Sequence, residues 1–287
     1  MRCVSPMSVA RPPGRSATDR IVIPCGQCFA CISNLRESWC NRIMAEQKHS
    51  SSSNFVTLTY ATEHLKFTSA GLPSLCKKDF QNFAKRLRKK LASMPELQTV
   101  KLKYYAIGEY GTKKLRPHYH IALFNFPQLG HISKLIDFIS DAWGLGSVHV
   151  GKIELASVRY VTNYVINKYV HDEFDEREKP FSLISKGMGI SYLTPEIIGY
   201  HQNNEEFTMR TLQGKAQLPR YYKEKLFHKD QIKLNRERTQ PELDKRYEEN
   251  QKRRSEFSSG NPFFYRMQAE TQARIQYFKK LKGGSTF

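Results

Sequence analysis

Two histidines separated by a single residue, His118 and His120, are the side chains of this sequence best suited to bind a metal ion. They begin an alternating segment typical of a β-strand, in which residues i and i+2 point to the same side, so both imidazoles can chelate one cation. Antiparallel pairing with a strand over 101–107 would bring Glu109 to the two histidines as a third ligand. Two nitrogens and a carboxylate leave coordination positions open, as a Mg²⁺ or Mn²⁺ ion acting as a Lewis acid on phosphate requires. A purely structural histidine pair is the alternative, but the stiff Arg-Pro dipeptide before the strand favours the metal site.

Two tyrosines and a lysine form a second group with chemical potential. Tyr160, Tyr164 and Lys168 are spaced by four residues, so on a helix over 157–170 they lie on one face. A tyrosine hydroxyl is a poor nucleophile at its usual pKa of about 10, but beside a metal-polarised phosphate it can attack and form a phosphotyrosine bond. One tyrosine could then hold a DNA end while the other attacks, with Lys168 stabilising the phosphate charge. The alternative is that both tyrosines are ordinary core residues of an amphipathic helix.

Three of the six cysteines lie within the seven-residue segment CGQCFAC. Such close spacing does not suggest a disulfide framework, whereas C-x-x-C places two thiolates at one tetrahedral metal ion. The zinc ligands that we expect are Cys3, Cys25, Cys28 and Cys31, with Cys40 as the alternative to Cys3. An iron–sulfur cluster is a second option, and a set of partly buried thiols is the alternative without any metal.

The elements that must position these residues follow from the apolar patterns along the chain. Predicted strands span 55–60, 101–107, 118–124 and 147–155, and predicted helices span 35–47, 77–91, 132–143 and 157–170. Strands and helices interleave without a strict βαβ rhythm, which favours an α+β fold with a central antiparallel sheet flanked by helices. We expect an N-terminal arm with the cysteine-rich element over 1–48, the α+β domain over 49–214, and a basic extension over 215–287. The extension is expected to be helical or partly disordered, without a convincing strand.

The charge of the chain indicates a polyanionic partner. The 287 residues include 46 Lys+Arg and 27 Asp+Glu, a formal net charge of +19, and 12% aromatic residues, as in a folded protein. Such a surface attracts nucleic acid, although charge alone does not separate DNA from RNA. The candidate phosphate contacts are the cations of the helix over 77–91 and one at the start of the histidine strand: Lys85, Arg86, Arg88, Lys89 and Arg116. The alternative for the helix is an ordinary solvated face.

Neither a membrane span nor a signal peptide is expected. No window approaches the ~18 to 20 apolar residues of a membrane helix, and the first twenty residues have no apolar core. A reducing cytoplasm is therefore the expected location.

Several of these segments, taken in order, carry a family resemblance. They are Pro24-Cys25-Gly26-Gln27-Cys28-x-x-Cys31, 55–60, the basic helix, Gly108-Glu109-Tyr110-Gly111, Arg116-Pro117-His118-Tyr119-His120 and Tyr160-Val161-x-x-Tyr164-Val165-x-x-Lys168, with a weaker echo at Pro219-Arg220-Tyr221-Tyr222. The set resembles the HUH endonuclease superfamily, and within it the replication initiation proteins of microviruses, the small single-stranded DNA bacteriophages, of the gokushovirus type. The stretch from about 24 to 170 is covered in the expected order.

The resemblance implies rolling-circle replication in the host bacterial cytoplasm. Such a protein recognises single-stranded origin DNA, nicks it site-specifically through a tyrosine, stays attached to the 5′ phosphate and leaves a 3′-OH for a host DNA polymerase. The second tyrosine would cleave the regenerated origin, and the strand would be rejoined. In this scheme His118, His120 and, less directly, Glu109 bind the divalent cation, and Tyr160 and Tyr164 are the nucleophiles. A host helicase is implied as well, because the chain has no G-x-x-x-x-G-K-[ST] phosphate loop.

Two other classes of function remain as alternatives. One is a non-catalytic zinc-containing nucleic-acid-binding protein, in which the cysteines and the basic helix are the functional parts. The other is a metal-dependent hydrolase, in which a metal-bound water replaces tyrosine. The tyrosine pair discriminates between the three, since neither a binding protein nor a hydrolase needs it.

Overall fold

An antiparallel sheet of five strands is the centre of Met1–Tyr192, the first of two units into which the chain divides, and Leu193–Phe287 is the second. The structure is a computed structural model, and it describes residues 3, 6–10, 20–26, 28–111, 114–127, 130–167 and 175–256. The helices and strands of the first unit are β1 (Met7–Ala10), β2 (Arg20–Ile23), α1 (Phe29–His49), β3 (Ser53–Thr59), β4 (Lys66–Phe67), β5 (Pro73–Ser74), α2 (Lys77–Ala92), β6 (Lys103–Tyr110), β7 (Pro117–Phe124), α3 (Ile132–Trp143), β8 (Val148–Gly151), α4 (Leu155–Asn167) and β9 (Phe181–Ile184).

The strand order of the sheet is β8-β3-β7-β6-β9, so β7 lies in the centre between β3 and β6. Its register places His118 opposite Glu109 of β6 and Thr59 of β3, and His120 opposite Thr57 of β3. Because paired residues of an antiparallel sheet point to the same face, these side chains share one side. The fold class expected from the sequence, an α+β protein with a helix-flanked antiparallel sheet, is confirmed.

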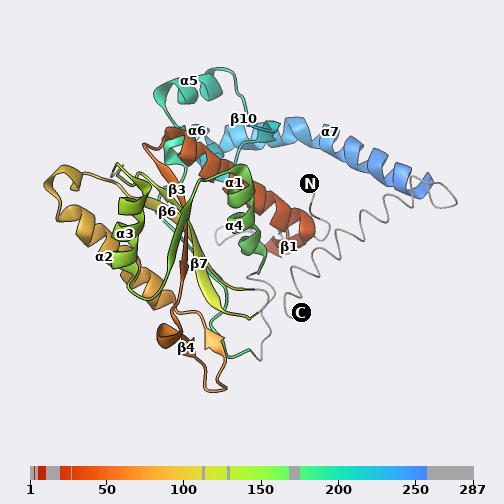
Figure 1. Cartoon of the computed structure of the whole chain (residues 1–287). Coiled ribbons are helices and arrows are strands. Elements are labelled where there is room, and N and C mark those ends of the chain that lie inside the picture. Colours follow the sequence, from red (N-terminus) through yellow and green to blue (C-terminus); the bar gives the residue numbers. More distant parts are fainter. Residues whose placement is uncertain are drawn as a thin grey trace. The chain divides into compact units, whose positions relative to one another are not determined.

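Helices α2 and α3 cover the face of the sheet that does not carry the histidines (Figure 1). The residues of α2 that are buried there are those that the helical spacing predicts: Phe80, Phe83, Ala84, Leu87 and Leu91. They pack with Tyr119, the residue between the two histidines, and with Trp143 of α3. The Tyr119 hydroxyl contacts the Tyr60 hydroxyl at 2.7 Å, which satisfies two polar groups in this buried layer.

Helices α1 and α4 cover the other face, on the side of the histidines (Figure 1). Ile43 of α1 and Val158 and Val161 of α4 are fully buried in a second core cluster with the sheet residues Ile107 and Ala122. This packing fixes the position of α4 over the centre of the sheet, and α4 is the helix that carries the tyrosine pair.

The second unit consists of two short helices, a hairpin and a long helix. They are α5 (Pro195–Asn203), β10 (Thr208–Thr211), β11 (Gly214–Gln217), α6 (Arg220–Leu226) and α7 (Lys229–Glu256). Phe207 and Phe227 stack with ring centroids 4.0 Å apart, and Tyr222, from the weak Pro-Arg-Tyr-Tyr echo, is a core residue. No helix in the described part of the chain is both long and apolar enough to cross a membrane.

Some elements differ from those expected. Helix α1 begins at Phe29, six residues before the predicted start, and β8 ends at Gly151 rather than at residue 155. Strand β6 extends to Tyr110, so Glu109 belongs to the strand itself. The contacts separate the two units after Tyr192, whereas the sequence places the start of the basic extension at residue 215. The expectation of no strand in the extension is wrong for β11, which is too short to show an alternating pattern.

Candidate functional site

Three side chains meet on the α4 side of strands β6 and β7. The Oε1 atom of Glu109 lies 2.7 Å from Nε2 of His118 and 2.9 Å from Nε2 of His120. One ligand atom from each of the three lies within 4.8 Å of the others. The structure therefore brings together the two histidines and the glutamate that the sequence nominates, and their grouping is compatible with a metal ion.

The outer nitrogens of the two imidazoles are held in place by neighbouring groups. Nδ1 of His120 lies 2.9 Å from Oγ1 of Thr57, and Nδ1 of His118 lies 3.1 Å from the carbonyl oxygen of Arg116. A carbonyl only accepts, so Nδ1 of His118 carries a proton, and in a neutral ring the lone pair of Nε2 points toward Glu109. Such contacts to the outer nitrogen are typical of metal-binding histidines because they fix ring orientation and tautomer.

The charges of the cluster also fit a cation. Burial would raise the pKa of Glu109, which is only 1% exposed, but hydrogen bonds from His118, His120 and Tyr160 outweigh it and hold that pKa below its usual value. Burial would lower the pKa of His118, but the hydrogen bond and charge of Glu109 raise it above its usual value. Each shift reports a need for positive charge between the nitrogens and the carboxylate.

One buried atom in the cluster has room for a further interaction. Oε2 of Glu109 has no hydrogen-bond partner among the described residues, and a buried carboxylate oxygen without a partner is unfavourable. A divalent cation would satisfy it together with the lone pairs on Nε2 of both histidines. The residues present thus fit a divalent cation of the kind that accepts mixed nitrogen and oxygen ligands.

Tyr160 of α4 reaches the same cluster. Its hydroxyl donates a 2.5 Å hydrogen bond to Oε1 of Glu109, and its ring packs edge-to-face on His120 with centroids 5.2 Å apart. The side chain is nevertheless 43% exposed, so a ligand from solvent can approach the hydroxyl. Burial of the hydroxyl, followed by the charge of Glu109, raises the pKa of Tyr160 above its usual value, and the phenol keeps its proton in this arrangement.

The other members of the tyrosine group lie largely outside the described part of the chain. Tyr164 belongs to α4, one turn after Tyr160, but its side chain is outside the described residues, and so is all of Lys168. Their predicted roles therefore stay predictions.

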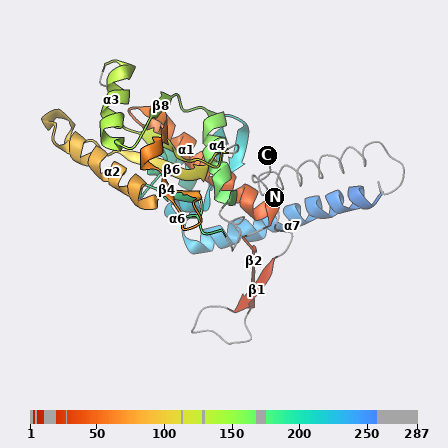
Figure 2. The same cartoon turned by 60° about the horizontal axis from the view of Figure 1, so that its bottom comes forward.

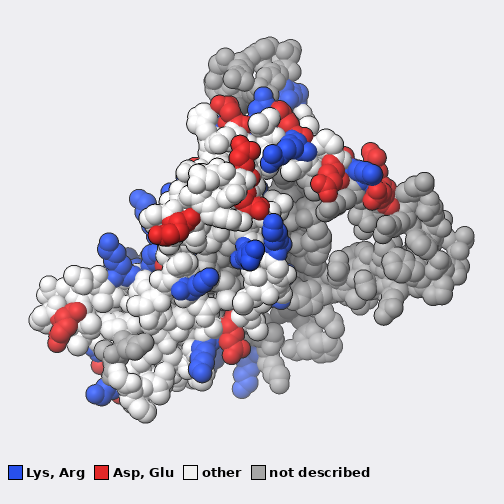
Figure 3. Space-filling view, turned by 90° about the horizontal axis from the view of Figure 1, so that it is seen from above, with Lys and Arg blue, Asp and Glu red and all other residues white. Residues whose placement is uncertain are grey.

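The predicted DNA-binding cations are not gathered around the histidines. Lys85, Arg86, Arg88 and Lys89 are exposed on α2, which covers the opposite face of the sheet (Figure 1). Arg86 also has a structural role, since its guanidinium donates to the last two carbonyls of α3 at 2.7 and 2.8 Å. Arg116 is close to the site, where it donates to the carbonyl oxygen of Tyr60 at 2.7 Å. In the space-filling view, basic and acidic residues are interspersed on the visible face (Figure 3).

Two supporting residues on β3 were not nominated from the sequence. Thr57 holds His120 by its hydroxyl, and Phe55 stacks on the same imidazole with centroids 5.5 Å apart and planes 23° apart. Both lie on the same face of the predicted strand over 55–60 as Thr59, and that alternation was the available signal. What the sequence could not show is that this face lies next to the histidine strand.

The four cysteines expected to bind zinc also lie together. One sulfur from each of Cys3, Cys25, Cys28 and Cys31 lies within 4.8 Å of the others, an arrangement compatible with metal binding. The fourth member of the group is Cys3, because Cys40 is buried in the core between α1 and the sheet.

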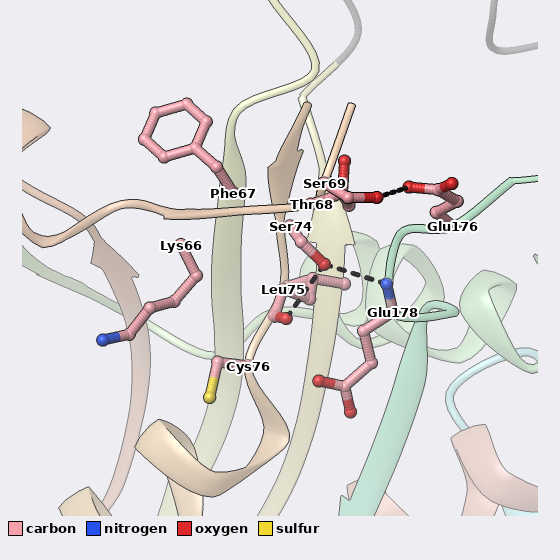
Figure 4. A pocket seen from close by; sticks show the side chains of 9 residues that line it. All are labelled: Lys66, Phe67, Thr68, Ser69, Ser74, Leu75, Cys76, Glu176 and Glu178. Carbon is pink, nitrogen blue, oxygen red and sulfur yellow. Dashed lines mark hydrogen bonds between the residues drawn. The ribbon is translucent and has the colours of Figure 1, made fainter. Parts of the chain in front are cut away.

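A cavity of about 530 Å³ lies beside the β4–β5 hairpin, away from both cysteine and histidine clusters (Figure 4). Its walls include the carboxylates of Glu176 and Glu178, and Ser69 donates to the former at 2.6 Å. Two carboxylates disfavour a phosphate ligand, so the cavity does not add to the site.

Comparisons with known proteins agree with this arrangement. The model of a family of replication-associated proteins, described by its ORF2 member, matches residues 53–169, from β3 to the end of α4. The chain is 31% identical to the replication-associated protein ORF2 of Spiroplasma virus 4 over 239 residues, which are 75% of this chain and 73% of that protein. It is 31% identical to the replication-associated protein VP4 of Bdellovibrio phage phiMH2K over 252 residues, 78% of this chain and 76% of that protein.

A third relative is more distant. The replication-associated protein ORF4 of Chlamydia phage 1 is 26% identical over 162 residues, 52% of this chain and 39% of that protein. No solved structure shows a significant match to the chain. The segment shared with the family contains the histidines, the glutamate and the tyrosine helix, and two phage proteins match over about three quarters of their own length. The chain therefore belongs to the family of microvirus replication-associated proteins.

Proposed function

We propose that this chain initiates rolling-circle replication by nicking one strand of origin DNA through Tyr160, with the metal-site geometry of HUH endonucleases. The observation on which this rests is the hydrogen bond from the Tyr160 hydroxyl to Glu109, inside the group formed with His118 and His120. A structural tyrosine has no need to reach a cation-binding cluster while leaving 43% of its side chain exposed. A nucleophile needs both.

The reaction follows from the positions of these groups. A Mg²⁺ or Mn²⁺ ion bound by His118, His120 and Glu109 would act as a Lewis acid on the scissile phosphate. The Tyr160 oxygen attacks phosphorus, the bond from phosphorus to the 3′ oxygen breaks, and a 5′-phosphotyrosine and a 3′-OH result. The phenol proton leaves toward Oε1 of Glu109, which it already contacts, and the 3′ oxygen takes a proton from water. Because one phosphoester replaces another, the reverse reaction can rejoin the strand without an external energy source.

Tyr164 and Lys168 complete the proposal through their spacing. Tyr164 follows one turn after Tyr160 on α4, so after one round of synthesis it would cleave the regenerated origin while Tyr160 still holds the first end. Lys168 would stabilise negative charge on the phosphate. Lys85, Arg88, Lys89 and Arg116 are proposed to hold DNA outside the reaction centre.

The partners follow from the proposed reaction and from the relatives. The 3′-OH would serve a host DNA polymerase, and a host helicase would open the duplex, since the sequence has no phosphate-binding loop of its own. Replication of a phage genome places the protein in the host bacterial cytoplasm.

The test is strand cleavage on single-stranded oligonucleotides that tile the phage genome, with Mg²⁺ or Mn²⁺ and a denaturing gel. We expect a DNA–protein adduct that depends on the cation and is reduced at least about a thousandfold by Tyr160→Phe. Tyr200→Phe, which changes an exposed tyrosine of the second unit, is the control and should keep full activity.

The same gel separates the alternatives. Cleavage that persists in Tyr160→Phe and Tyr164→Phe together, with a free 5′ phosphate, would indicate a hydrolase. DNA binding without any cleavage at any tiled position would indicate a non-catalytic binding protein, and either result contradicts the proposal.

A further inference from the structure

Four cysteines from three places in the chain converge at the open end of the N-terminal hairpin. Cys3 precedes β1, Cys25 follows β2, and Cys28 and Cys31 lie at the beginning of α1. The sulfurs of Cys3 and Cys25 are 3.5 Å apart, and those of Cys3 and Cys28 are 3.8 Å apart. This cluster shares no residue with the histidine site.

These separations are those expected around a single tetrahedral ion. Zn–S bonds of about 2.3 Å at tetrahedral angles place neighbouring sulfurs about 3.8 Å apart. A disulfide bond, at about 2.05 Å, is much shorter. In an iron–sulfur cluster the thiolates bind different irons, which keeps their sulfurs farther apart than one shared ion does.

We propose that Cys3, Cys25, Cys28 and Cys31 bind one Zn²⁺ ion, which fastens the β1–β2 hairpin to the N-terminus of α1. The ion is structural, since four thiolates leave no open position for substrate.

The surrounding backbone supports thiolates at this place. The amide of Cys28 donates to the sulfur of Cys25, and the amide of Cys25 donates to the sulfur of Cys3, both at 3.3 Å. Cys28 is the N-cap residue of α1, and Cys31 lies in its first turn. The partial positive charge of a helix N-terminus stabilises negative sulfur.

The hairpin itself shows why a fastening is needed. Neither β1 nor β2 contains a buried residue, and the pair extends away from the central sheet (Figure 2). A two-stranded hairpin without a packed face is only marginally stable in water. Its side-chain link across the strands, from Arg20 to Ser8 at 3.0 Å, is exposed and contributes little. A metal ion at the open end would supply the missing stability.

The fastened helix leads to the catalytic side of the sheet. Arg36 of α1 donates to the side chain of Asn163 on α4 at 2.9 Å, and Ile43 is fully buried against the sheet. Zinc therefore stabilises the first turns of a helix that packs against the helix carrying Tyr160, without contacting the reacting groups.

The test measures metal content in the full-length chain, produced in bacteria and purified without chelators. We expect about one zinc per chain in the wild type and near zero in Cys28→Ser. Cys76→Ser, which changes a half-buried cysteine outside the cluster, and His118→Ala should each keep about one zinc. Since Cys28→Ser could fail to fold, wild-type protein stripped of metal is also titrated with Co²⁺, and the absorption of a tetrahedral cobalt tetrathiolate is expected.

Three results would overturn the proposal: wild-type protein that contains no zinc and gives no tetrathiolate cobalt spectrum, iron in place of zinc, or loss of zinc in His118→Ala. The outcome is independent of the proposed nicking reaction. His118→Ala should lose strand cleavage while keeping zinc, and absence of zinc would leave the tyrosine adduct unexplained by this cluster but intact.

Discussion

Replacement of Thr57 by valine tests whether the hydroxyl next to His120 holds a metal ligand in place. Thr57→Val keeps a β-branched side chain of similar shape on β3, but it removes the oxygen 2.9 Å from Nδ1 of His120. The loss of a single hydrogen bond should lower the free energy of unfolding by only about 0.5 to 1.5 kcal/mol. The imidazole would lose the contact that fixes its orientation and tautomer.

The effect on metal binding should be larger than the effect on folding. Loss of such a supporting group typically reduces metal affinity 10- to 100-fold, which corresponds to about 1.4 to 2.7 kcal/mol. We therefore expect the Mn²⁺ dissociation constant of the full-length protein, measured by calorimetry or by electron paramagnetic resonance of free Mn²⁺, to rise by that factor. The Mn²⁺ dependence of strand cleavage should shift in parallel, and saturating Mn²⁺ should restore most of the rate.

The matched control is Thr59→Val. Thr59 lies on the same strand and the same face, opposite His118, but its hydroxyl donates to the carbonyl oxygen of Ser147 at 3.4 Å and contacts no histidine. Its replacement should change Mn²⁺ affinity less than about twofold, within the usual range for substitutions away from such contacts. Equal Mn²⁺ affinities in the Thr57 and Thr59 variants would refute the reasoning.

Three further substitutions test how the fold supports the site. Arg86→Met removes the guanidinium from the last carbonyls of α3 and should cost about 1 to 2 kcal/mol in urea unfolding, whereas Lys89→Met on the same helix should change stability by less than about 0.5 kcal/mol; equal effects would remove the capping role. Tyr119→Phe deletes a buried hydroxyl between α2 and β7 and should cost about 1 to 3 kcal/mol, with Mn²⁺ affinity nearly unchanged because the ring faces away from the histidines; a large loss of affinity would contradict that separation. Gly146→Ala places a methyl group against the backbone at the end of β3 at a positive φ of 153° and should cost at least about 3 kcal/mol, whereas Gly151→Ala, with open space around it, should be close to neutral; similar unfolding midpoints would show that the close approach is not real.

Local patterns predicted the parts of the site that depend on strand and helix periodicity. The same-side placement of His118 and His120 follows from the two-residue repeat of a strand, and the buried face of α2 follows from the helical repeat. The placement of Glu109 required only the assumption that two neighbouring strands pair, and β6 and β7 do pair in that register.

The remaining features depend on contacts between segments far apart in the sequence. The support of His120 by Thr57 requires the pairing of β3 with β7, sixty-three residues apart, and the capping of α3 by Arg86 bridges fifty-six residues. Neither leaves a mark in a local pattern, so Arg86 was interpreted only as a DNA contact. Strands β1 and β2 are four residues each and mostly exposed, which gives no apolar alternation from which to predict them.

The most direct test of the central claim is to locate the bond between protein and DNA. The full-length protein is allowed to cleave single-stranded DNA with Mn²⁺, the adduct is digested with nuclease and protease, and the modified peptide is fragmented in a mass spectrometer. We predict a nucleotide phosphate on Tyr160, and the same attachment in a Tyr164→Phe variant. Attachment only to a residue outside α4, or cleavage that leaves no covalent nucleotide, would contradict the assignment of Tyr160 as the nucleophile.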